Sequence, residues 1–256
     1  METLTFNGIL SSDFGIYVIG NNDAEVPEFD YESTDIPGVF KAFHQSNKRY
    51  KNKQVVYHCM CKQDASNKIS QFCGAMLADG IYQRITDTIH PEYYKIGTFI
   101  GGTQPRFYGS KDVATFDLLF DCDPRKFLVG GDTFQTVTIG QDFELTDARP
   151  GLFYNPVFKV KGIISVQFRR QLIDGNDWAT YYLFSVNDDA PELYFDTETK
   201  YAYYGTSNRD EYVYGIYART PMLLPGPNDY KVFLRFTQQT GVSNASASVA
   251  LREYIL

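Results

Sequence analysis

The chain has 256 residues, enough for one large β domain or two ordinary ones, and 43% of them are hydrophobic, so it can bury a packed core and is not disordered. Its net charge is −7 and its pI is about 5.0, and its lysines and arginines form no strong cluster, which argues against a nucleic-acid-binding protein. No apolar run reaches the roughly 20 residues of a membrane-spanning helix, and Met1-Glu2-Thr3 lacks the basic start of a signal peptide.

Aromatic residues are unusually frequent, with 20 Tyr and 20 Phe beside a single Trp. These side chains fit the pleated, half-buried surface of a sheet, so the composition predicts a β protein with an aromatic core. Tyrosine is also enriched at protein interfaces, and the surplus therefore fits an assembly protein as well.

Short alternating runs bounded by turn residues predict strands in the first half. From Asp35-Ile36-Pro37-Gly38 to Asn52 the alternation fades, and we expect a long loop there. Loops of that length inside a compact domain are usually functional or mobile. The predicted strands and extended stretches are 4–9, 14–18, 26–34, 54–61, 81–86, 93–101 and 113–122.

One helix is predicted in the first half, directly after the strand 54–61. Asp64 or Ser66 can cap its start, and Asp79-Gly80 can end it. Its apolar side chains recur at helical spacing, and a helix with one such stripe must lie on a sheet. The stripe consists of Ile69, Phe72, Cys73, Met76 and Leu77.

The cysteines do not form a metal or catalytic motif. Cys59 and Cys61 alternate on one predicted strand and share a face, whereas the intervening strand position His58 faces the other way. Zinc needs four ligands at knuckle-like spacing, and a nucleophile needs a base on its own side. We therefore predict buried free thiols, no metal and no cofactor.

Catalytic signatures are missing elsewhere too. The three carboxylates Glu192, Asp196 and Glu198 alternate along a predicted strand and its turn, and could mimic the carboxyl pair of a glycosidase. The solvated face of an antiparallel sheet explains the same pattern more simply. We expect no catalytic residue, and the chain is predicted not to be an enzyme.

The second half shows no helical period. Gly130-Gly131-Asp132 separates it from the first, so we expect a domain 1–130 and a domain 131–256. Short strands between turns such as Asp174-Gly175-Asn176-Asp177 predict an antiparallel sandwich. Its predicted strands are 133–139, 156–161, 163–171, 178–186, 191–196, 200–205, 212–217, 229–238 and 246–255.

A series of short motifs also runs along nearly the whole chain. In order, they are Phe6-Asn7-Gly8, Ser12-Asp13-Phe14-Gly15-Ile16, Pro37-Gly38, Arg49-Tyr50-Lys51-Asn52, Phe120-Asp121-Cys122-Asp123-Pro124-Arg125-Lys126-Phe127-Leu128, Asn155-Pro156, Leu193-Tyr194-Phe195-Asp196 and Leu224-Pro225-Gly226-Pro227-Asn228. In this order and spacing the chain resembles the distal tail protein (Dit) family of phages with long non-contractile tails.

The resemblance implies a mainly β protein with two domains. The first would be a β-sandwich or barrel-like domain with one packed α-helix, which forms a hexameric ring joining the tail tube to the baseplate hub. The second would be a galectin-like β-sandwich that docks receptor-binding proteins. Expected partners are further copies of the chain, the tail tube protein, the tail-associated hub protein and a receptor-binding protein, and the expected location is the tail tip of the virion after synthesis in the host cytoplasm.

We predict that the segment 35–52 is a ring or tube contact; the rival hypothesis is a disordered surface loop in the monomer before assembly. Its candidate residues are Asp35, Ile36, Pro37, Gly38, Phe40, Phe43, Arg49 and Tyr50. One alternative function is a carbohydrate-binding module that contacts the host cell surface, for which the candidate aromatic surface is Tyr201, Tyr203 and Tyr204. A glycoside hydrolase is a third hypothesis, but the sequence identifies no carboxyl pair for it.

Overall fold

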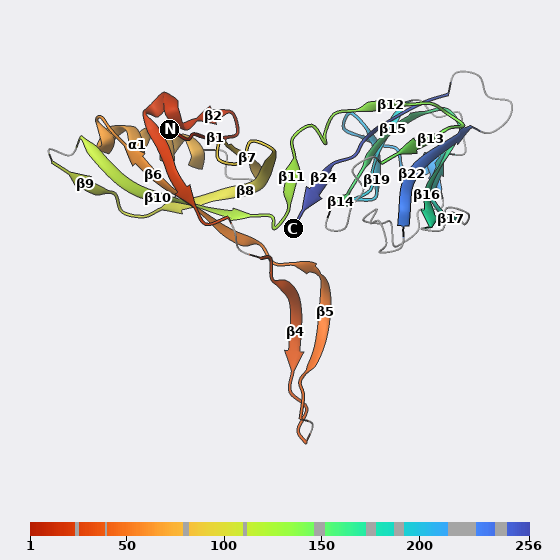
Figure 1. Cartoon of the computed structure of the whole chain (residues 1–256), viewed down its shortest axis with the longest axis horizontal. Coiled ribbons are helices and arrows are strands. Elements are labelled where there is room, and N and C mark those ends of the chain that lie inside the picture. Colours follow the sequence, from red (N-terminus) through yellow and green to blue (C-terminus); the bar gives the residue numbers. More distant parts are fainter. Residues whose placement is uncertain are drawn as a thin grey trace. The chain divides into compact units, whose positions relative to one another are not determined.

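The computed structural model describes residues 1–23, 26–38, 40–78, 82–109, 112–145, 152–172, 178–186, 192–214, 229–238 and 245–256. The chain divides into two units, Met1–Val129 with Leu256, and Gly130–Ile255. Both consist mainly of antiparallel strands (Figure 1), and α1 (Ala65–Leu77) is the one α-helix among the described residues. The expected mainly β fold class is therefore confirmed.

The large sheet of the first unit curls back on itself. Its strands run in the order β2-β1-β7-β8-β10-β6-β3, with β9 beside β10 and β11 beside β8. An isolated bridge then pairs Val18 of β3 with Glu2, close to β1, so the sheet resembles a barrel. The bounds are β1 Leu4–Phe6, β2 Ile9–Leu10, β3 Ile16–Asn21, β6 Lys53–Cys61, β7 Gln83–Asp87, β8 Tyr93–Gly102, β9 Arg106–Tyr108, β10 Val113–Cys122 and β11 Lys126–Leu128.

Strand β10 shows how the alternating sequence builds the core. Every second side chain is buried, among them Ala114, Phe116, Leu118 and Phe120, and this confirms the strand predicted at 113–122. The neighbouring strand β6 faces the same core with Val55, Tyr57, Cys59 and Cys61. These two alternating strands therefore lie side by side and form one apolar face.

Helix α1 packs on this core through Ile69, Phe72 and Met76, and the ring of Phe72 lies 5.3 Å from that of Phe14. Asp64 precedes the helix as predicted, but its side chain makes no cap bond and instead accepts a hydrogen bond from Asn67. The predicted apolar stripe is too wide, because Leu77 is 58% exposed. The predicted end at Asp79-Gly80 lies outside the described residues.

Two expectations at the N-terminus are wrong in detail. The single strand predicted at 4–9 is a pair, β1 and β2, because Asn7 and Gly8 take positive φ angles of 47° and 80° and form a tight hairpin turn. The strand predicted at 14–18 begins later, at Ile16, after a 3-10 helix over Ser11–Phe14.

The loop predicted at 35–52 is also wrong. The structure has an antiparallel pair there, β4 (Phe29–Thr34) and β5 (Phe43–Tyr50), joined by a turn that includes Pro37 and Gly38. We call the described residues of 26–52 the arm; it appears in Figure 1 as a separate two-stranded ribbon. Periodicity missed it because neither face of β5 is buried, so its residues Phe-His-Gln-Ser-Asn-Lys-Arg-Tyr show no apolar alternation.

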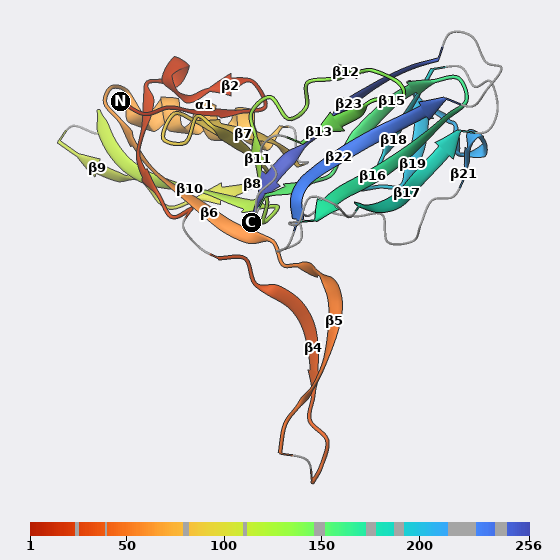
Figure 2. The ribbon, with the colours of Figure 1, turned by 45° about the vertical axis from the view of Figure 1, so that its right-hand side comes forward.

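The second unit is a sandwich of two sheets (Figure 2), and the antiparallel sandwich is confirmed. One sheet has the order β12-β23-β15-β18-β19-β20 and the other β13-β22-β16-β17-β21. Phe158 and Phe195 of the first meet Phe184 of the second at ring distances of 5.3 and 4.5 Å. The bounds are β12 Gln135–Val137, β13 Asp142–Glu144, β15 Val157–Lys161, β16 Ile164–Leu172, β17 Trp178–Val186, β18 Leu193–Asp196, β19 Tyr201–Tyr204, β20 Ser207–Asn208, β21 Val213–Tyr214, β22 Asp229–Gln238 and β23 Ser246–Ala250.

One predicted strand of this unit is divided. The run 246–255 forms β23 and a separate strand, β24 (Glu253–Ile255), which pairs with β14 (Phe153–Tyr154). The break falls at Arg252, whose positive φ of 47° turns the chain out of the extended conformation. The turn predicted at 174–177 lies outside the described residues, and so does the motif at 224–228.

Candidate interaction surfaces

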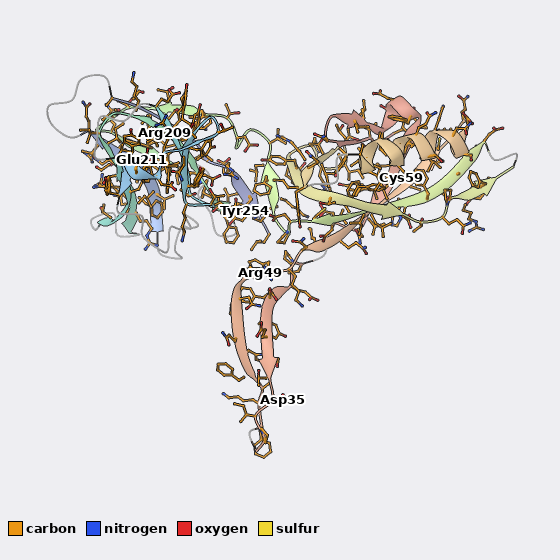
Figure 3. The ribbon with its side chains drawn as sticks, turned by 180° about the vertical axis from the view of Figure 1, so that it is seen from behind. Asp35, Arg49, Cys59, Arg209, Glu211 and Tyr254 are labelled. Carbon is orange, nitrogen blue, oxygen red and sulfur yellow. The ribbon has the colours of Figure 1, made fainter. Side chains whose placement is uncertain are left out.

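The arm exposes apolar side chains along its whole length. Its two strands pair only with each other, and an isolated two-stranded hairpin is marginally stable in water. Figure 3 shows Asp35 near the turn and Arg49 near the opposite end. Apolar exposure is greatest at the turn, where Phe40 is fully exposed. The exposed large hydrophobic residues are Val26, Phe29, Tyr31, Ile36, Phe40 and Phe43.

The arm has one aromatic and one charged side. On the aromatic side, Phe29 lies edge-on to Tyr50 at 5.3 Å, and Tyr31 lies edge-on to His44 at 4.8 Å. On the charged side, Arg49 donates a hydrogen bond of 2.7 Å to Asp30 and lowers the pKa of that carboxyl. An exposed ion pair of this kind adds little stability, whereas burying apolar rings is favourable. Covering the aromatic side would therefore stabilise the arm more than covering the charged side.

A buried charge cluster lies where the arm joins the sheet. It is centred on Asp23, shortly before the arm, and on Lys53, directly after it, whose Nζ lies 2.9 Å from the Asp23 Oδ1. Lys95 of β8 and Lys126 of β11 reach the other carboxylate oxygen at 3.1 and 3.2 Å. Burial opposes ionisation of Asp23, but the three ammonium groups outweigh it, and the pKa of Asp23 is lowered.

Lys95 links this cluster to a second carboxylate. Its Nζ donates to the Tyr57 hydroxyl at 3.0 Å and to Asp87 at 3.1 Å, and Tyr57 itself donates to Asp87 at 2.7 Å. Burial raises the pKa of Tyr57 well above its usual range, and the negative charge of Asp87 is the second cause of this shift. The cluster therefore links the chain on both sides of the arm to the four strands β6, β7, β8 and β11. Sequence reasoning missed it, although Lys53 and Lys95 occupy core-facing positions of alternating strands.

The predicted outward tyrosines are only partly brought together. Tyr201 and Tyr203 share one face of β19 and lie nearly parallel, 6.1 Å apart, whereas Tyr204 lies on the opposite side of the strand. Tyr194 of β18 stacks on Tyr203 at 5.5 Å, and Phe134 lies edge-on to Tyr194. Neither Tyr194 nor Phe134 is among the candidates predicted from the sequence. Tyr194 is recognisable by its alternation with the buried Leu193 and Phe195.

A groove of about 350 Å³ adjoins these rings. Its lining residues are Asp132, Phe134, Val157, Tyr194, Asp196, Tyr203, Ala250 and Arg252. The Arg252 guanidinium binds Asp196 at 2.8 Å and Glu198 at 3.4 Å. Glu192 is paired separately with Lys159 at 3.1 Å. The three carboxylates considered for a glycosidase are thus held in ion pairs, Asp196 within β18 and the other two beyond its ends.

The cysteines are core residues. Cys59, Cys61 and Cys122 are buried and Cys73 is half-buried, and all four are free thiols. Burial raises the pKa of Cys122 to about 12, so this thiol stays protonated at neutral pH. His58 points away from Cys59, as predicted, with its Nδ1 2.7 Å from Asp117. Within the described ranges, no group of His, Cys, Asp and Glu could hold a metal ion, and no helix is long and apolar enough to span a membrane.

Comparison with known proteins rests on structure. No protein-family model and no curated protein matches the chain. The crystal structure of SPP1 Dit (gp 19.1), described as a paradigm of the hub adsorption apparatus in phages that infect Gram-positive bacteria, aligns over 100% of both chains with a TM-score of 0.63 at 14% identity. The chain has the fold of a phage distal tail protein. This confirms the fold expected from the sequence motifs.

Two structures of the phage P2 baseplate in its activated conformation, one with Ca and one with Sr, align less well with the distal tail fold seen here. Each match covers 97% of both chains at 8% identity, with TM-scores of 0.44 and 0.43. These likenesses are too weak to add to the assignment, which rests on the match with SPP1 Dit.

Proposed function

We propose that this protein is a structural component of the distal end of a phage tail. In this proposal six copies of the first unit form a ring that joins the tail tube protein to the tail-associated hub protein, and the second unit docks receptor-binding proteins. The main support is the distal tail fold, which matches SPP1 Dit along the whole of both chains. The protein is assembled into the tail tip of the virion and performs no catalysis.

The arm is the proposed ring or tube contact. It carries all eight residues chosen from the sequence: Asp35, Ile36, Pro37, Gly38, Phe40, Phe43, Arg49 and Tyr50. A hairpin with one exposed aromatic side and an apolar turn is stabilised when another chain covers it. A ring needs head-to-tail contacts between two different surfaces, and a projecting ribbon suits one half of such a contact.

Replacing both Phe40 and Phe43 by aspartate is expected to weaken ring formation. Two buried aromatic anchors together contribute at least about 2 kcal/mol to an interface, so the dissociation constant should rise about thirtyfold or more. Native mass spectrometry of the full chain measures this as a shift from six times 29.2 kDa to the single chain. The matched control is Leu77→Asp, an apolar residue on α1 that is as exposed as Phe43, and this variant should leave the ring intact.

Some ring proteins assemble only on their partners, so the same variants are also compared in virions. Gold-labelled antibody against the native protein should mark one end of the tail, and the arm variant should be missing from purified particles. The proposal is wrong if the native protein is monomeric in solution and also absent from the tail tip.

A further inference from the structure

The sheet containing β18 and β19 presents a built groove on the side away from the sandwich core. Tyr194, Tyr203 and Tyr201 lie nearly parallel at centroid distances of 5.5 and 6.1 Å. Rings at these distances are offset rather than superposed, so each leaves part of a face uncovered. Phe134 is 40% exposed and closes one side of the groove, edge-on to Tyr194.

Charged groups at the same groove are held in fixed positions. Arg252 has a positive φ of 47°, a conformation that costs free energy for a residue other than glycine. Its backbone N–H is held by a 2.8 Å bond to the Gly131 carbonyl, and its guanidinium by Asp196 and Glu198. Arg252 and Asp196 both line the groove beside the tyrosines, so a donor and a carboxylate acceptor are present there.

The aromatic row also carries hydroxyl groups. Burial, with the nearby Asp196 as the second cause, raises the pKa of Tyr203, so its hydroxyl remains protonated at neutral pH. The groove therefore offers ring faces, O–H and N–H donors, and carboxylate acceptors within one space of about 350 Å³. That volume lies at the lower end of the range for small-ligand sites.

We propose that this groove binds an uncharged saccharide of one or two hexose rings. A pyranose has an apolar C–H face that packs on an aromatic ring, and hydroxyls that both donate and accept hydrogen bonds. The lining holds two carboxylates and one guanidinium, so a phosphate or another strongly anionic ligand is disfavoured. Tyr203 and Tyr194 stack on the sugar, and Asp196 and Arg252 bind its hydroxyls.

Saturation-transfer NMR with the full chain tests this site. The probes are glucose, galactose, rhamnose, N-acetylglucosamine, N-acetylgalactosamine, lactose and maltose, each at millimolar concentration. We expect at least one probe to receive saturation. The Tyr203→Ala substitution should lower the affinity for that probe by about tenfold or more. The Tyr203→Phe variant keeps the ring and should lose less affinity than Tyr203→Ala. Comparing the two variants separates the contribution of stacking from that of the hydroxyl hydrogen bond. The matched control is Tyr204→Ala, next in sequence but on the other side of β19, which should bind as the native chain does.

Three results would overturn the site. The first is no saturation of any probe by a folded native chain, and the second is equal weakening of probe binding by Tyr203→Ala and Tyr204→Ala. A Tyr203→Ala chain that still binds the probe but no longer binds a receptor-binding protein would also reject it, because the groove would then be a protein-docking surface. Native mass spectrometry of Tyr203→Ala should still show the ring, so failure of the saccharide site is distinguishable from failure of the tail-tip proposal.

Discussion

Replacing Asp23 by asparagine should lower the free energy of unfolding of the first unit by about 3–5 kcal/mol. The carboxylate is almost fully buried and faces three ammonium groups, those of Lys53, Lys95 and Lys126. The neutral amide would leave those positive charges with Asp87 as their remaining buried counterion. The substitution nearly preserves volume, so the loss reports on charge rather than packing.

Urea titration with hydrogen exchange on the amides of β6 and β8 measures this effect where it arises. Hydrogen exchange on the amides of β16 and β22 follows the second unit and should not change. The matched control is Asp30→Asn, which breaks the exposed pair with Arg49 and should cost far less than the loss of Asp23. Equal losses in the two variants would mean that the buried cluster does not stabilise the unit.

The same cluster predicts a pH dependence. The folded pKa of Asp23 lies below its ordinary value of 3.8, so its ionisation stabilises the fold at pH above that value. This contribution should be lost as the pH falls from 3.8 through the lower folded pKa. The unfolding midpoint in urea should therefore fall more steeply with acid for the native chain than for Asp23→Asn, and parallel curves would contradict the assignment.

Replacing Phe120 by alanine should cost about 3–5 kcal/mol in the first unit. The side chain is fully buried, and its ring contacts Phe6, Tyr57 and Phe99 at centroid distances of 5.5, 5.7 and 5.4 Å. Truncation would remove these contacts and leave a cavity that β6, β8 and β10 cannot close without moving. The measurement is the urea unfolding free energy from circular dichroism.

The control for this packing prediction is Phe107→Ala on β9. Phe107 is 37% exposed and lies beside β10, so the same truncation should cost less than about 1.5 kcal/mol. A similar loss for Phe107 and Phe120 would show that the aromatic cluster is not the centre of this core.

Much of the fold could be predicted from the sequence because burial leaves a periodic pattern. The strict alternation of β10 and the spacing of Ile69, Phe72 and Met76 on α1 are both visible in the residues alone. The order of short motifs was enough to predict the distal tail fold. In each case a face that contacts the core selects apolar residues at fixed intervals.

The sequence could not predict features that depend on which distant residues meet. The arm shows no alternation because no core covers β5, and only the pairing of β4 with β5 reveals it. Asp23 and Lys126 are separated by more than 100 positions, yet they share one buried cluster. The groove in the second unit likewise needs Phe134, Tyr194 and Arg252 from separate parts of the chain. Local periodicity reports burial, whereas the position of a contact between distant segments is set by strand order and register, and tertiary packing alone decides those.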